Sequence, residues 1–146
     1  MDRKSVCAEL DQLNEATLKD LYRFMDLACF TFQNKDQIYN LHIQSDWRLT
    51  LEDEIILARE DIYCEDQEDT SKFDRTVCSI PKDLAVKSWK MTPFGDLTLS
   101  FQSSTGANWM LHSFSDSSGH DEMWRLIHVD TEKAHLVCYP SGFAFE

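Results

Sequence analysis

The sequence predicts an α+β fold of two antiparallel β-meanders, about four strands each, flanked by short helices and related by an internal pseudo-two-fold repeat. Three observations predict it. Apolar and polar residues alternate over long stretches, short motifs recur in the same order in both halves, and helical spacing is confined to short segments. At 146 residues with 42% apolar content, the chain can bury one core, so we expect a single domain over residues 1–146.

Alternation is clearest between residues 41 and 51. The odd positions carry Leu, Ile, Ser, Trp, Leu and Leu, and the even positions between them carry His, Gln, Asp, Arg and Thr. A period of two over eleven residues is typical of a half-buried strand or hairpin. Leu97, Leu99 and Phe101 alternate with polar residues in the second half, and turn-forming residues lie at 34–36 and 103–106. Each half is therefore expected to form a small meander that ends in an apolar strand.

The two halves share short motifs in the same order. Each half has an aromatic strand motif, then Leu-His, then Ser-Asp, then Trp-Arg-Leu; these lie at 30–33, 41–42, 45–46 and 47–49, and again at 99–102, 111–112, 115–116 and 124–126. The second copy carries an insertion over 117–123. The ordered matches predict that Trp47 and Trp124 are equivalent core anchors, with Arg48 and Arg125 on the polar face.

One short helix is predicted at each end of the first half. Val6, Leu10 and Leu13 lie on one helical face and indicate an N-terminal helix. Ser71 is a candidate N-cap for a later helix. That helix would bury two apolar residues and end before a proline, at Phe73, Val77 and Pro81 respectively.

A further helix is predicted after Asn14, which is a candidate N-cap. Its apolar face would hold Leu18, Leu21, Tyr22 and Met25. A strand over residues 21–26 is the alternative interpretation.

The charge of the chain limits its partners. Twenty-six acidic residues face fourteen basic ones, a formal net charge of −12. Nucleic-acid binding requires a basic surface and an acidic membrane would repel the chain, so we expect neither. A basic protein is the partner that such a field attracts. With no apolar run near the ~20 residues of a membrane span and no signal-peptide stretch, a cytoplasmic location is expected.

No motif for catalysis or for a cofactor is present. The five cysteines are odd in number and lack C-x-x-C spacing, so we expect reduced thiols and no zinc site. Metalloprotease, nucleophile-elbow, P-loop and Rossmann patterns are missing, and we expect no enzyme activity and no cofactor. The segment from His112 to Glu122 contains His120, Asp116 and Asp121 around a Ser-Ser-Gly turn. A small hydrolase or a ligand-binding α+β domain that uses this loop is the alternative.

Acidic residues are densest just after residue 58. A carboxylate-rich segment that also carries an aromatic ring suits an interface with a basic cleft, because the charges steer the partner and the ring anchors it. The second-half loop adds three more acids. The predicted partner-binding residues are Glu60, Asp61, Tyr63, Glu65, Asp66, Glu68, Asp69, Asp116, Asp121 and Glu122.

Several segments together resemble a known family. The stretches LHIQSDWRL, REDIY, LTLSF, WMLHSFSD and MWRL, in a small acidic chain, are similar to immunity proteins of bacterial contact-dependent growth inhibition and related polymorphic-toxin systems. The resemblance spans roughly residues 20–140 and is closest to the Whirly-like group, in which two four-stranded sheets are related by a pseudo-two-fold. It implies a stoichiometric inhibitor of the toxic C-terminal nuclease domain of a cognate effector. The family has no shared functional residues to carry over.

Overall fold

The computed structural model describes residues 2–64 and 70–146 and is mostly antiparallel β-sheet with two short α-helices. The fold class is therefore α+β in the coarse sense, with strands predominating. The strands are β1 (Thr17–Phe24), β2 (Leu27–Asn34), β3 (Gln37–Ile43), β4 (Asp46–Leu51), β5 (Glu54–Ala58), β6 (Ala85–Met91), β7 (Leu97–Gln102), β8 (Asn108–Phe114), β9 (Trp124–His128), β10 (Leu136–Tyr139) and β11 (Gly142–Phe145). The helical segments are α1 (Arg3–Asp11), η1 (Arg59–Ile62), α2 (Lys72–Thr76) and η2 (Val77–Ser79).

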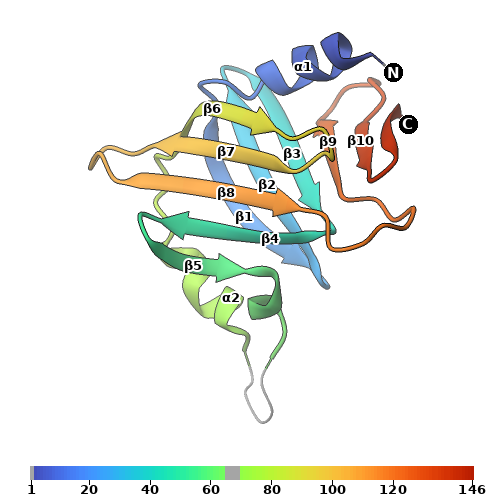
Figure 1. The fold of residues 1–146 in the computed structure, drawn as a ribbon. Helices are drawn as coiled ribbons and strands as arrows, with labels where there is room; N and C mark the ends of the chain where they lie inside the picture. Colours follow the sequence, from blue (N-terminus) through green and yellow to red (C-terminus); the bar gives the residue numbers. More distant parts are fainter. Residues whose placement is uncertain (1, 65–69) are drawn as a thin grey trace.

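The strands form two layers that are joined at one edge. The order through the sheet is β11-β10-β9-β3-β2-β1-β6-β7-β8-β4-β5. The first layer runs from β11 to β1 and the second from β6 to β5; a single registered pair, Thr17 with Ala85, links them. In Figure 1 the second layer lies in front and its strands run across those of the first layer.

Each half exchanges two strands with the other half, which corrects the expected meanders. Strands β1–β3 and β6–β8 are meanders of three strands, but β4 leaves its own meander to pair with β8, and β9 leaves to pair with β3. Backbone N–H groups of Gln44 and Ser45 both donate to the Met123 carbonyl at the point where the chain changes layers. Alternation of apolar and polar residues determines which face of a strand is buried, but it does not determine which strand pairs with it.

The recurring motifs occupy matching positions in this exchange. Across β4 and β8, Trp47, Arg48 and Leu49 lie opposite Ser113, His112 and Leu111. Across β9 and β3, Trp124, Arg125 and Leu126 lie opposite Ile43, His42 and Leu41. The Leu-His motif of each half thus pairs with the Arg-Leu of the other, and both Trp side chains are buried, at 1% and 0% exposure.

The predicted second helix is wrong, because its residues form β1. Leu18 and Leu21 are both buried although they are three positions apart, a spacing that normally places strand residues on opposite faces. The pairing with β2 shifts register between Leu18 and Asp20, so a bulge at Lys19 restores both leucines to the inner face. The bulge makes a strand look helical in its apolar spacing. A shift of the same kind lies in β6, between Val86 and Ser88.

The other two predicted helices are present, but the second is shorter than predicted: α2 ends at Thr76, and Val77 is only half-buried in η2. The Ser5 backbone N–H donates to Asp2 Oδ1 at 2.7 Å and caps α1, whose apolar face is buried. The Asp74 N–H donates to the Ser71 hydroxyl at 3.1 Å and caps α2, as predicted. Phe73 of α2 is 1% exposed and meets Trp47 edge-on, with ring centroids 6.2 Å apart.

Aromatic pairs connect the two layers through the core. Phe30 of β2 meets Trp47 of β4 edge-on at 5.6 Å, and Phe32 of β2 stacks on Phe101 of β7 at 6.3 Å. Such pairs stabilise a core by about 0.5–1.5 kcal/mol beyond their buried area. Among the described residues, no helix is both long and apolar enough to pass through a membrane.

Candidate functional site

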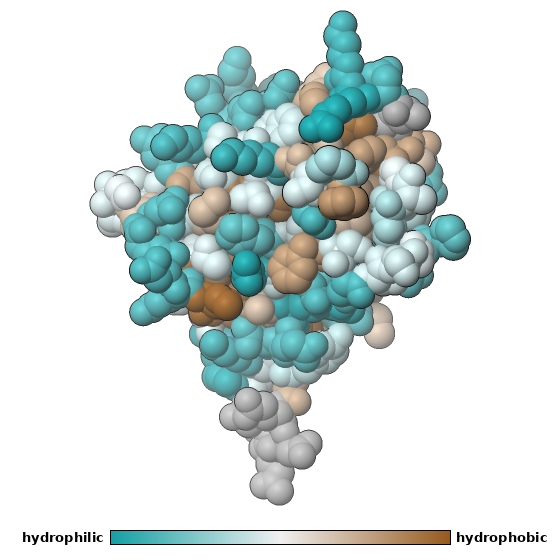
Figure 2. All heavy atoms as spheres, in the orientation of Figure 1, coloured by the Kyte–Doolittle hydropathy of each residue, from teal (hydrophilic) through white to brown (hydrophobic). Residues whose placement is uncertain are grey.

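Carboxylates gather at the turns and strand ends. Within the described part of the chain only three acidic residues belong to strands, namely Asp20, Asp46 and Glu54. Figure 2 views the second layer from outside; most of this face is teal or white, and the brown areas are small. The remaining described acids thus lie in turns, loops and helical segments outside the strands.

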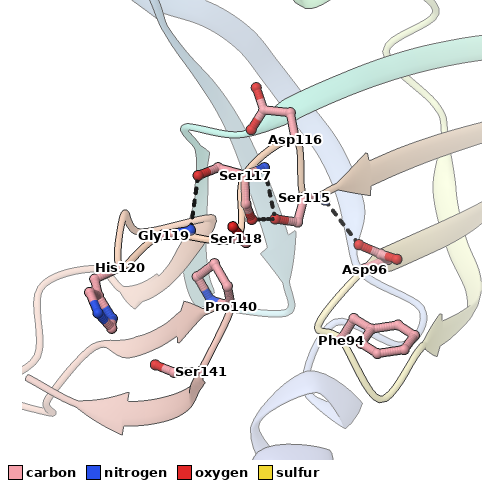
Figure 3. A pocket seen from close by; sticks show the side chains of 10 residues that line it. All are labelled: Phe94, Asp96, Ser115, Asp116, Ser117, Ser118, Gly119, His120, Pro140 and Ser141. Carbon is pink, nitrogen blue, oxygen red and sulfur yellow. Dashed lines mark hydrogen bonds between the residues drawn. The ribbon is translucent and has the colours of Figure 1, made fainter.

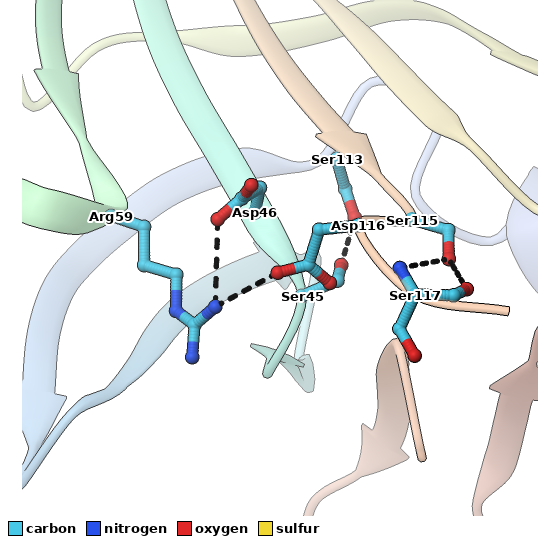
Figure 4. A network of polar contacts seen from close by, with 7 residues as sticks. All are labelled: Ser45, Asp46, Arg59, Ser113, Ser115, Asp116 and Ser117. Atoms are coloured by element: carbon cyan, nitrogen blue, oxygen red, sulfur yellow. Dashed lines mark hydrogen bonds and ion pairs between the residues drawn. The ribbon is translucent and has the colours of Figure 1, made fainter. Parts of the chain in front are cut away.

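Arg59 joins two segments that the sequence analysis treated separately. Its Nη1 lies 3.4 Å from Asp46 Oδ1 and 3.3 Å from Asp116 Oδ2, as Figure 4 shows. We call these three residues the Arg59 corner. Because all three side chains are about one-quarter to two-fifths exposed, each ion pair contributes little to stability, on the order of 0–1 kcal/mol. The two ion pairs instead fix a position: they hold η1, which begins at Arg59, beside the loop after β8.

Three adjoining hollows form a groove past this corner. The first, of about 290 Å³, includes Phe24, Met25, Gln44 and Arg59. The second, of about 200 Å³, shares the last two and extends to Asp116, Asp121 and Glu122. The third, of about 660 Å³, shares Asp116 and the neighbouring serines with the second and reaches Phe94. We call the third hollow the Phe94 pocket and the whole surface the groove.

Apolar side chains mark both ends of the groove. Phe24, the last residue of β1, and Met25, in the turn that follows it, are 68% and 75% exposed, and Phe94 is 71% exposed. Exposed aromatic and Met side chains are enriched where proteins bind partners. An acidic middle between apolar ends is thus complementary to a partner that combines basic and apolar groups.

The predicted residues of the acidic segment have different environments. Glu60 is exposed on η1, and Tyr63 is 46% exposed and close enough to influence Arg59 electrostatically. Asp61 has a structural role, since its Oδ2 accepts the Ala58 backbone N–H at 2.8 Å. The predicted residues Glu65, Asp66, Glu68 and Asp69 lie outside the described residues.

The three predicted acids of the second-half loop border the groove, but only one is free on the surface. Asp121 is exposed, whereas Asp116 takes part in the Arg59 corner. The Glu122 side chain is 11% exposed; it accepts from Arg125 Nη2 and from Gln44 Nε2, both at 2.7 Å. Glu122 therefore holds β9 to the end of β3 and presents little charge to a partner.

The residues of the hydrolase alternative lie apart. His112 is on the outer face of β8 opposite Arg48, and burial together with that guanidinium lowers its pKa. His120 borders the Phe94 pocket, and Asp116 pairs with Arg59. Over residues 2–64 and 70–146 no hydrogen bond joins either histidine to a carboxylate, and no group of His, Cys, Asp or Glu has metal-binding geometry.

Sequence reasoning missed Arg59, Gln44 and the exposed residues Phe24 and Phe94. Arg59 stands alone among acids in the sequence, and only the strand exchange brings Asp46 and Asp116 beside it. The phenylalanines carry a usable signal, because each lies at or beside a turn, two residues before an aspartate, where burial is rare.

Comparison with known proteins identifies no family for this chain. No family model, no curated protein and no solved structure matches the chain.

Proposed function

We propose that this chain is an immunity protein that binds and neutralises the toxic C-terminal nuclease domain of a cognate contact-dependent growth inhibition effector. It would act in the cytoplasm of the producing cell, as a binding protein and without catalysis. The observation that carries the proposal is the groove, whose acidic middle and apolar ends suit the basic, phosphate-binding cleft of a nuclease. The net charge of −12 supports it, because opposite charges speed the encounter of two proteins.

We also infer that the two halves are related by an approximate two-fold axis between β1 and β6. Exchanging β1–β5 with β6–β10 maps the strand order onto its own reverse, apart from the extra β11. The matching bulges of β1 and β6, and the stacking of Phe32 on the corresponding Phe101, support this symmetry. The insertion after β8, which borders the groove, would then be an addition to a duplicated scaffold.

The test of the function uses the gene neighbouring this one. The C-terminal domain of a large exported protein encoded immediately upstream is expressed with and without this chain, and growth and nuclease activity are measured. We expect the chain to restore growth and to abolish the nuclease activity at equimolar ratio. A neighbouring domain that is not bound, or one that stays active when saturated, would refute the proposal.

Charge-neutralised variants locate the interface within the same complex. Asp61 is kept because it caps η1, and the test variant neutralises five acids: Glu60, Glu65, Asp66, Glu68 and Asp69. The control neutralises five acids that belong neither to the acidic segment nor to the groove: Asp20, Asp36, Asp53, Glu54 and Glu132. Steering can raise association to roughly 10⁸ M⁻¹s⁻¹ at low salt. We expect the test variant to associate much more slowly than the control, with unchanged melting temperatures. Equal rates would place the interface elsewhere.

Tyr63 is the proposed anchor of this interface. If it fills a pocket on the partner, Tyr63→Ala should weaken binding by about 2 kcal/mol or more, mainly through faster dissociation. The matched control is Phe145→Ala, which removes a comparably exposed aromatic ring, 43% against 46%, from the far end of the sheet. Equal effects of the two substitutions would remove Tyr63 from the interface.

A ligand-binding domain is the second candidate, because the Phe94 pocket of about 660 Å³ is large enough for a small molecule and includes His120. The two functions differ in one measurement. An immunity protein inhibits its nuclease with one-to-one stoichiometry without any added small molecule, whereas a ligand-binding domain has no effect on that nuclease.

A further inference from the structure

We propose that the Phe94 pocket receives an arginine side chain of the partner protein. This inference rests on the proposed function and deepens it by naming the group that the groove recognises. The pocket lies between two walls, as Figure 3 shows: Phe94 and Asp96 on one side, His120, Pro140 and Ser141 on the other, with the loop after β8 between them.

The pocket is rich in acceptors of hydrogen bonds. Its border contains the carboxylates of Asp96 and Asp116 and four serine hydroxyls, and no Lys or Arg among the described residues lines it. A guanidinium has five N–H donors and no acceptor, so it needs such surroundings. The volume of about 660 Å³ exceeds one side chain and leaves room for the backbone that carries it.

Phe94 adds the second component of a guanidinium site. Phe94 follows a proline in a tight turn and is 71% exposed. Packing within this chain therefore does not explain why the residue is aromatic. Arginine stacks its planar group on an aromatic ring while it pairs with carboxylates, a combination that a lysine ammonium fits less well.

The wall that carries both groups is held rigidly. The Phe94 and Asp96 backbone N–H groups donate to Thr92 Oγ1, at 3.3 and 3.1 Å, and the Thr92 N–H donates to the Asp96 carbonyl at 3.0 Å. Asp96 Oδ1 accepts the Ser115 N–H at 3.0 Å, which joins this turn to the loop after β8. A site held in place before binding loses less conformational entropy when it is occupied.

A guanidinium already lies on the neighbouring carboxylate. Arg59 approaches Asp116 Oδ2 from the adjoining hollow, which shows that this part of the groove accommodates such a group. Arg59 does not border the Phe94 pocket itself, so the pocket and its Asp96 remain available to a second guanidinium from outside the chain.

The test titrates the whole protein with N-acetyl-arginine amide at low salt and follows backbone amide signals of Ser115, Ser117 and Gly119 by NMR. N-acetyl-citrulline amide, which has the same shape and no charge, is the control probe. We expect saturable shifts at these three amides with a dissociation constant in the millimolar range for arginine, and at least tenfold weaker binding of citrulline. Equal binding of both probes, or shifts spread over all acidic turns, would overturn the proposal.

Variants assign the binding to the pocket. Asp96→Asn keeps the acceptor for the Ser115 N–H and removes the charge, and we expect arginine binding at least fivefold weaker. Phe94→Ser, at an exposed position, should also weaken it and serves if Asp96→Asn does not fold. Asp53→Asn, an exposed turn acid outside the groove, should bind as the parent does. Unchanged binding by a folded Asp96→Asn would contradict the inference.

The same variants separate this inference from the proposed function. If Asp96→Asn weakens binding of the nuclease domain by tenfold or more, the occupant is an arginine of the partner. If it binds the nuclease as the parent does while it loses the arginine probe, the site is a receptor for a free guanidinium compound, and the assignment to the partner is overturned. Growth rescue by the unaltered chain tests the immunity function independently of either result.

Discussion

Two buried tryptophans at matching positions differ in a single hydrogen bond. Trp124 Nε1 donates to the Gly95 carbonyl at 2.9 Å, whereas the buried Trp47 Nε1 has no partner among the described residues. Both rings fill the core, and truncation of either to Ala should cost about 3–5 kcal/mol. Their polar atoms, however, should contribute with opposite sign, because a buried N–H without a partner is itself destabilising.

Phenylalanine substitutions isolate that difference. Trp124→Phe leaves the Gly95 carbonyl with only the weak Cys138 thiol donor at 3.9 Å, and Trp47→Phe removes an unpaired donor, while both lose similar volume. We expect Trp124→Phe to lower the free energy of unfolding by about 1–2 kcal/mol more than Trp47→Phe, measured by urea denaturation. Equal losses would mean that the Trp47 indole N–H is hydrogen-bonded in solution.

A histidine on the outer face of β8 should make stability depend on pH. Burial and the nearby Arg48 guanidinium hold the pKa of His112 below its ordinary 6.5, so the unfolded chain takes up a proton at a higher pH than the folded chain. Below about pH 6.5 the unfolded state binds more protons, and stability falls as pH falls. The free energy of unfolding of the parent relative to His112→Gln should therefore decrease between pH 7.5 and 5.5. A constant difference would show that His112 titrates alike in both states.

At the scale of elements, the turn between β6 and β7 depends on one glycine. Gly95 has a φ of +86°, and a Cβ there would lie 2.5 Å from Cys138 Sγ. Gly106, in the turn between β7 and β8, has a φ of +77°, and a Cβ there would meet no atom within 4 Å. Both glycines have a positive φ, and they differ in the space that is available for a Cβ.

Alanine at each of these glycines measures the two effects. Gly106→Ala should cost about 1–2 kcal/mol from backbone strain. Gly95→Ala should cost a further 1–3 kcal/mol or so, because the methyl group displaces Cys138 and with it the turn that holds Phe94. Thermal or urea unfolding checks both values. Similar losses would indicate that the Cys138 thiol moves aside easily.

Sequence patterns predicted the elements better than their arrangement. Trp47 and Trp124 were identified as buried because alternation reports which face of a strand meets the core. The β1 strand is predicted as a helix, with a strand over 21–26 only as the alternative, because the bulge at Lys19 gives Leu18 and Leu21 a helical spacing. The Arg59 corner could not be predicted, because Asp46 and Asp116 approach Arg59 only through pairings between halves, and no local pattern encodes a strand's distant neighbour.

At the scale of the whole molecule, the strand exchange makes the halves interdependent. Fragments 1–67 and 68–146 each keep a three-stranded meander, but each also carries a hairpin whose partner strand, β8 or β3, belongs to the other fragment. We expect neither fragment to show the cooperative unfolding of the intact chain, and an equimolar mixture to recover its circular dichroism spectrum. A fragment that unfolds cooperatively as a monomer would contradict this dependence.

Because of the same exchange, some strands are synthesised well before the strands with which they pair. Strand β4 emerges about 60 residues before β8, the strand it must join. At a synthesis rate of about 5–20 residues per second, the apolar side chains of the β4–β5 hairpin stay exposed for roughly 3–12 s before β8 is made. Glu52 and Asp53 of its turn, with the adjoining Glu54 of β5, are suited to this interval, because like charges on neighbouring nascent chains repel and delay their aggregation. Some of the acidic residues can thus protect the nascent chain from aggregation, before the protein binds any partner.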